Sequence, residues 1–175
     1  MTCGRMTTAA APKPGSPTWK SLRKDLAIDL AINGLGWAAA SALQTDKFFD
    51  LLGGVAHIAM ILRHAIPRLL AARHSKAEHA TSAGAAARSP RMHPRQVLGS
   101  AAAMLWAVRL SGYLFSRNVA SGMDKRFVKA VKMPLVFGQF WLFQASWAFL
   151  NLLPLLVSNS KTGEELRDKP LNRWD

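Results

Sequence analysis

The sequence predicts an all-α protein: a polytopic transmembrane helical bundle of about four spans, with a disordered basic loop. Two observations predict this class. Half of the 175 residues are hydrophobic and fall in four blocks, while the 23 Lys and Arg residues, against 10 Asp and Glu, lie mostly between those blocks. A soluble basic protein would mix apolar and charged residues along each amphipathic element. The length suits one domain.

The predicted membrane domain covers 26–157 and follows a basic, polar tail at 1–25. Its first span is 26–43, and a helix of that length measures about 27 Å, which just crosses a bilayer core. The second span is predicted at 48–66. Pro67 follows, and we expect the helix to end there because proline disfavours the helical conformation at the residue before it.

A loop at 68–96 is rich in Ala, Ser, Arg and His and is expected to be poorly ordered. The third span is predicted at 97–116, and a basic linker at 117–132 leads to the fourth span at 134–157. Residues 158–175 form a polar tail. The fourth span carries no charged residue, which argues most strongly against the alternative of a soluble helical bundle.

The basic residues predict the orientation. With four spans, both tails and the segment 63–96 lie on one side and hold 16 Lys and Arg, against six on the other. The positive-inside rule then places both termini on the cytosolic, stromal or matrix side. The acid-poor N-terminal tail is compatible with an organelle transit peptide or a plain cytosolic tail. The predicted location is therefore the endoplasmic reticulum or an organelle membrane.

Two other classes of site are not expected. The sequence pI is near 11, but the aromatic residues lie mainly in the apolar blocks and not beside the basic residues, as they would in a nucleic-acid-binding face. The five histidines are scattered and form no helical pair with a third ligand, so we expect no metal site. Cys3 is the single cysteine, which excludes an intrachain disulfide.

Small residues recur at a spacing of four within the spans, which permits close helix contact in lipid. The pairs are Gly34/Ala38, Gly36/Ala40 and Gly99/Ala103.

Polar residues also recur every four positions in the first span, at Asp25, Asp29 and Asn33, so they share one helical face. Asp29 lies inside the apolar run. A carboxylate in hydrocarbon is costly, so it must face the bundle interior, pair with another group, or be protonated. Two interpretations remain open at this point: a structural partner of Arg109, or a functional group.

The third span carries a second polar stripe, and its members are Trp106, Arg109, Tyr113 and Arg117. Arg109 is placed well inside the span. An intramembrane arginine beside Trp and Tyr is typical of an anion or cofactor contact that lines a polar cavity. The alternative is an ion pair with Asp29 or Asp50 that only fastens helices together.

Several motifs together resemble the steroid 5α-reductase-like membrane superfamily, in particular its uncharacterised branch from bacteria, plants and algae. They are Thr45-Asp46-Lys47-Phe48-Phe49-Asp50-Leu51-Leu52-Gly53, Trp106-Ala107-Val108-Arg109-Leu110 with Gly112-Tyr113-Leu114-Phe115, Gly122-Met123-Asp124-Lys125-Arg126-Phe127, and Phe140-Trp141-Leu142-Phe143-Gln144-Ala145 followed by Leu153-Pro154. The resemblance covers about residues 26–160, the N-terminal half of such proteins.

The resemblance implies a function. Members of this superfamily are polytopic helical enzymes that use NADPH to reduce a carbon–carbon double bond in a steroid or another lipid. It further implies two groups of site residues. Arg109, Asp124 and Arg126 would lie near the cofactor, and Asp50, Trp106 and Tyr113 would line the lipid pocket.

One departure from the family pattern shapes the expectation. Similar proteins continue through further spans and an Asn-Tyr/Gly-Glu type motif that completes the cofactor site. We therefore expect part of a reductase: either a truncated gene model or a half that pairs with a separately encoded second-half polypeptide. The alternative is a non-catalytic structural subunit of a membrane complex.

Overall fold

The computed structural model describes residues 16–79, 92–161 and 166, and these contain helices and no strand. Four helices are long and apolar enough to cross a membrane. They are α1 (Pro17–Leu43), α2 (Phe49–His79), α3 (Pro94–Ser121) and α5 (Pro134–Ser160), and a short helix α4 (Phe127–Ala130) lies between the last two. The prediction of an all-α bundle with four spans is confirmed.

The first and third spans begin earlier than predicted because their N-terminal residues favour the start of a helix. Proline occupies the first turn of α1, α3 and α5, where its missing N–H would have no intrahelical partner. Ser16 caps α1 by accepting a hydrogen bond from the Trp19 amide at 3.2 Å. His93 and Gln96 form a capping box at the start of α3.

The predicted end of the second span was wrong. The helix continues through Pro67 to His79, so the first part of the predicted 68–96 loop is helical. Proline is tolerated inside a transmembrane helix where neighbouring groups satisfy the freed backbone. Pro154 is accommodated inside α5 in the same way. Residues 80–91 of that loop lie outside the described residues, and its last three residues already belong to α3.

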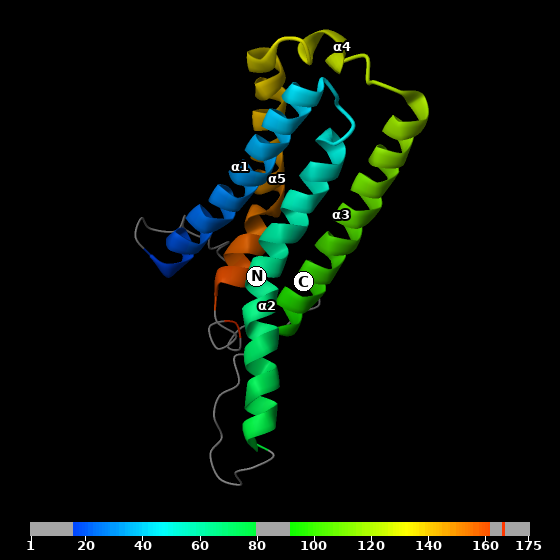
Figure 1. Cartoon of the computed structure of the whole chain (residues 1–175). Helices are drawn as coiled ribbons and strands as arrows, with labels where there is room; N and C mark the ends of the chain where they lie inside the picture. The colour runs from blue at the N-terminus through cyan, green and yellow to red at the C-terminus, as the bar shows by residue number, and fades with distance from the viewer. Residues whose placement is uncertain (1–15, 80–91, 162–165, 167–175) are drawn as a thin grey trace, which may run out of the picture.

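Figure 1 shows the helices running up and down, with α4 and the α1–α2 turn at one end of the bundle. The start of α1, the end of α2, the start of α3 and the end of α5 lie at the other end. The bundle centres on α2, which packs against α1, α3 and α5. α3 packs mainly on α2 and only slightly on α5. The α3–α5 side is therefore the loosest part of the fold.

Close helix contacts use two glycines that have no room for a side chain. A methyl group on Gly36 would lie 2.5 Å from the Trp141 ring of α5, and one on Gly54 would collide with Ser111 of α3. The predicted Gly36/Ala40 pair is thus at an interface, with Ala40 fully buried. Gly34 has open space around it, so the predicted Gly34/Ala38 pair is on the outer face.

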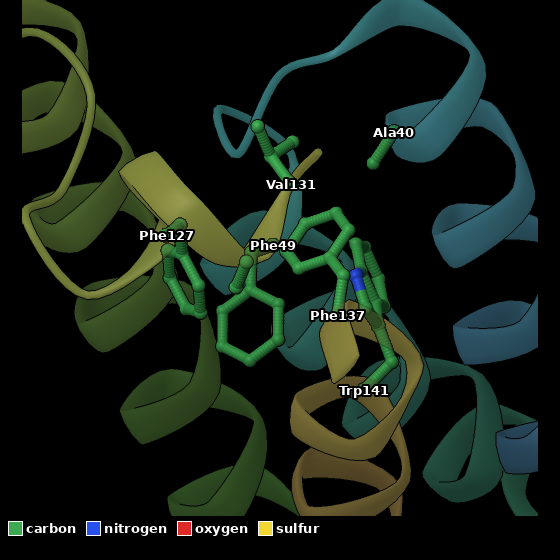
Figure 2. Packing of buried hydrophobic residues seen from close by; sticks show 7 residues of the cluster. Ala40, Phe49, Phe127, Val131, Phe137 and Trp141 are labelled. Atoms are coloured by element: carbon green, nitrogen blue, oxygen red, sulfur yellow. The ribbon is translucent and has the colours of Figure 1, made fainter. Parts of the chain in front are cut away.

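The α4 end of the bundle is closed by the aromatic cluster shown in Figure 2. The rings of Phe49 and Phe127 lie 4.8 Å apart, and Phe49 also meets Trp141 at 5.0 Å. Phe137 contacts both Phe127 and Trp141. Because Phe127 comes from α4, this cluster fastens the linker between α3 and α5 onto the bundle.

A charged cluster joins α1 and α2 near the opposite end. Arg63 Nε donates to Asp25 Oδ1 at 2.6 Å, and Arg63 Nη2 donates to the Ser21 hydroxyl at 2.6 Å. His64 Nε2 lies 3.0 Å from the other oxygen of Asp25. Asp25 is fully buried. The carboxylate therefore depends on these two α2 side chains in place of water.

The C-terminal end of α5 is capped by side chains from other helices. Arg68 donates to the carbonyl oxygens of Asn159 and Lys161 at 2.7 and 2.9 Å. Gln96 donates to the carbonyl of Ser158 at 2.7 Å. The last carbonyls of a helix have no intrahelical partners and carry negative partial charge, so a guanidinium and an amide stabilise this end.

We predict that Asp25→Ala lowers the free energy of unfolding by about 3–5 kcal/mol, because it leaves the Arg63 charge without its partner inside the bundle. Thermal or denaturant unfolding of the purified protein in mild detergent measures this. Asp124→Ala is the control: it breaks an ion pair whose Arg126 side chain is 60% exposed, and about 1 kcal/mol or less is expected. Equal losses for the two variants would contradict a structural role for the Asp25 cluster.

Candidate functional site

A cavity of about 360 Å³ lies between α2, α3, α5 and the start of α4. Its wall is largely aromatic, formed by Phe49, Trp106, Phe127, Phe140, Phe143 and Trp147. Five polar side chains also line it: Asp50, His57, Ser111, Arg126 and Gln144. An apolar cavity with a few convergent polar groups is the usual form of a small-molecule site.

A second cavity of about 380 Å³ lies on the outer side, between α1 and α5. Gly34 and Gly138 leave it open, and its wall is almost wholly apolar. It contains no ionisable side chain, so the first cavity is the candidate site.

The mouth of the candidate site is charged. Arg126 and Asp124 form an ion pair at 2.7 Å in the linker that precedes α4. Hydrogen bonds from the Arg126 side chain and backbone hold the pKa of Asp124 below its usual value, and the same pair raises the pKa of Arg126. Asp50 in the first turn of α2 faces the cavity from the other side.

The mouth is held in place by Asp46, which is 1% exposed. Its Oδ2 accepts a hydrogen bond from the Asp124 amide at 2.8 Å and one from the Asn118 side chain at 3.4 Å. The α1–α2 turn is thereby tied to the end of α3. Arg126 also lies over the Phe127 ring, 5.2 Å from its centroid, so the charged mouth rests directly on the aromatic cluster.

At the deep end of the cavity a histidine lies beside two indole rings, whose own centroids are 5.8 Å apart. His57 is 2% exposed, and its ring centroid lies 5.5 Å from those of Trp106 and Trp147. Its Nδ1 is 2.8 Å from the Gly53 carbonyl oxygen one turn earlier in α2. Asp50 and His57 are seven residues apart, about 10 Å along a helix, which sets the length of the cavity.

Gln144 fixes one wall through bonds to two other helices. Its Nε2 donates to Asn33 Oδ1 of α1 at 3.0 Å and to the Phe49 carbonyl of α2 at 2.9 Å. Asn33 in turn donates to Asp29 Oδ1 at 2.9 Å. Asp25, Asp29 and Asn33 are all buried, so the predicted polar face of the first span points into the bundle.

The structure brings four of the six predicted site residues together. Asp50, Trp106 and Arg126 line the cavity, and Asp124 pairs with Arg126. Arg109 and Tyr113 lie elsewhere: both are exposed on the outer side of α3, and Tyr113 is 62% exposed.

Arg109 and Tyr113 are exposed because a different face of α3 packs against α2. Small and polar residues form that face, and Ala107 and Ser111 are buried on it. Two residues along an α-helix turn it by roughly 200°, so Arg109 points away from Ala107. The alternative ion pair of Arg109 with Asp29 or Asp50 is not formed either. Asp29 is bonded to Asn33.

Sequence reasoning missed three residues of the site, His57, Gln144 and Trp147. A signal was present for His57, because Asp50, Gly53, Gly54 and His57 follow the i, i+3, i+4, i+7 spacing of one helical face. Gln144 and Trp147 likewise share a face of α5. Within the described residues, no group of three or more His, Cys, Asp or Glu side chains is arranged to hold a metal ion.

Comparison with known proteins places this fold in a family. Residues 36–175 match the model of DUF1295, described as a protein of unknown function. No curated protein and no solved structure matches the chain. The family match includes the C-terminal part of α1, from residue 36 on, and all of α2, α3, α4 and α5, and with them every residue that lines the candidate site. The chain therefore belongs to the DUF1295 family, which is part of the steroid 5α-reductase-like superfamily.

Proposed function

We propose that the protein is a membrane reductase component that binds a steroid or another lipid in this cavity and acts on a carbon–carbon double bond with NADPH. One observation carries the proposal: a cavity with aromatic walls has an ionisable group, Asp50, and an ion pair, Asp124–Arg126, at one end. Membership of the superfamily supports the same reaction class. The apolar wall suits a lipid, and the charged mouth suits a phosphorylated cofactor.

The residues present fit part of NADPH. A guanidinium contacts phosphate or carboxamide oxygens well, and the Arg126 side chain is 60% exposed at the mouth. The cavity volume of about 360 Å³ is near the lower end of small-molecule sites, so it suits the lipid and not a whole dinucleotide. The remaining cofactor contacts are assigned to a second polypeptide segment.

Within that scheme NADPH supplies a hydride, and this chain orients the lipid. Asp50, when protonated, can donate a hydrogen bond to a carbonyl oxygen conjugated with the double bond, which favours the negative charge that develops there. Phe49, Phe127 and Trp106 exclude water from the reacting carbon atoms. Asp46 and Asp124 keep Arg126 at the mouth.

We predict that Arg126→Gln weakens NADPH binding by roughly ten- to a hundredfold, the value of a charged hydrogen bond. Fluorescence titration of NADPH on the purified protein, with and without candidate second-half proteins, measures it. Lys125→Gln is the matched control, because Lys125 is an exposed cation one residue away that does not line the cavity. Arg109→Gln tests the cofactor role that the sequence resemblance implied.

The absence of saturable NADPH binding in both preparations would contradict the proposal and favour the alternative, a non-catalytic structural subunit of a membrane complex. That alternative predicts stable association with other membrane proteins. Native gel migration in mild detergent measures it, and a monodisperse monomer would count against it.

The orientation belongs to the same proposal. The end of the bundle that holds the start of α1 and the end of α5 faces the cytosol, stroma or matrix, and the membrane is that of the endoplasmic reticulum or an organelle. We predict that, in a Cys3→Ser background, Lys125→Cys resists a membrane-impermeant maleimide added from the cytosolic side, whereas Ser16→Cys reacts. Labelling of sealed vesicles measures this, and detergent should make both positions reactive. The reverse pattern would overturn the orientation.

A further inference from the structure

The deepest polar atom of the cavity has no partner. His57 Nε2 is buried and makes no hydrogen bond within the described structure. A buried polar group without a partner is costly, so it is rare in folded proteins and calls for a physical explanation. Here it belongs to a side chain that lines the candidate site.

The other ring nitrogen defines what this atom can do. Nδ1 lies 2.8 Å from the Gly53 carbonyl oxygen, and a carbonyl oxygen can only accept, so Nδ1 carries the proton. A charged imidazolium would lose its hydration in this buried, largely apolar part of the cavity, which is costly. In the neutral imidazole Nε2 is then an acceptor. The site offers a lone pair, which selects an O–H or N–H donor.

No neighbouring side chain of the cavity supplies that donor. The Ser111 hydroxyl donates to the Ala107 carbonyl of its own helix at 2.6 Å, and the Gln144 amide donates to Asn33 and Phe49. The indole N–H groups of Trp106 and Trp147 are donors too, but neither bonds to His57 Nε2, although both rings contact His57. A bound molecule can therefore supply the donor, and the largely apolar wall favours one that is otherwise apolar.

The cavity is open to such a molecule from the side. α3 and α5 meet where Gln96 and Ser100 of α3 contact the last residues of α5, and the cavity lies further toward the α4 end, where α3 rests on α2. Two of its wall residues, Phe143 and Trp147, are 73% and 51% exposed. In a bilayer these side chains face lipid tails, so the occupant comes from the membrane.

We propose that the cavity binds an uncharged lipid alcohol, whose hydroxyl group donates a hydrogen bond to His57 Nε2 at the deep end. The hydrocarbon part packs along the cavity wall, against the Trp106 and Trp147 rings that contact each other, and extends toward the lipid at the side of the bundle where Phe143 and Trp147 are exposed. A carboxylate has no proton to donate to this atom, and an ammonium would lose its hydration with the one acidic side chain of the lining, Asp50, at the other end of the cavity. The hydroxyl is the donor that suits both the nitrogen and its surroundings.

This inference deepens the proposed function and rests on it only in taking the cavity as the lipid site. It adds the chemical group that the lipid carries at the end away from Asp50 and Arg126. Lipid binding is measurable without NADPH, so failure of cofactor binding and failure of alcohol recognition are separate results.

The test uses the full chain in phosphatidylcholine nanodiscs and a photoactivatable hexadecanol with a diazirine on its tail. The methyl ether of the same probe is the comparison, because it has the same tail but no O–H donor. We expect the alcohol to label residues of α3 and α5 at the cavity and to half-saturate at about three- to tenfold lower concentration than the ether, as one net hydrogen bond requires. Competition with unlabelled hexadecanol shows that the labelling is saturable.

The variant His57→Phe keeps an aromatic ring and removes both nitrogens, so the alcohol and the ether should then bind equally. Ser146→Ala is the control, because Ser146 is an exposed polar residue of α5 that does not line the cavity, and the preference for the alcohol should persist. Thermal unfolding checks that each variant is folded. If His57→Phe does not fold, the comparison of alcohol and ether on the unmodified chain decides alone. Equal binding of the two probes there would overturn the proposal.

Discussion

The fold depends on the rule that a polar group placed inside a bilayer must find its partner within the protein. Gln144 shows how this rule determines the architecture. Its amide reaches Asn33 of α1 and the Phe49 carbonyl of α2 from its own helix, α5, so three helices meet at one side chain. Apolar packing in lipid is nearly non-selective, because lipid tails are as apolar as leucine. Bonds of this kind therefore set the register of the bundle.

α3 is held by a different means, and the cavity is the consequence. At one end Gln96 and Ser100 bind the last residues of α5, and at the other Asn118 reaches Asp46. Between these points α3 rests on α2 through small residues such as Ala107 and Ser111. A helix fixed to α5 at one end only leaves a wedge beside α5, and the aromatic side chains fill this wedge incompletely.

Sequence patterns predicted what hydrophobicity and helical period control. The four apolar blocks became four spans, and Asp25, Asp29 and Asn33 share the buried face that their spacing requires. The stripe of Trp106, Arg109 and Tyr113 shows the limit. A period identifies a face but not its neighbour, and α3 turns Ala107 toward α2, so Arg109 points outward. The spacing of His57 places it on the same face as Asp50, but its contacts with two indoles from other helices are not visible in any local pattern.

The position of the charged mouth links the orientation of the protein in the membrane to the compartment that must hold the cofactor. Arg126 and Asp124 lie at the α4 end of the bundle, opposite the start of α1 and the end of α5 (Figure 1). In the proposed orientation, the end with the start of α1 and the end of α5 faces the cytosol, stroma or matrix. A cofactor that contacts Arg126 must then be present in the opposite compartment. A cytosolic source of NADPH requires the reverse orientation, against 16 basic residues on one side and six on the other. The side of the membrane on which Lys125 is accessible therefore determines which compartment must hold the reductant.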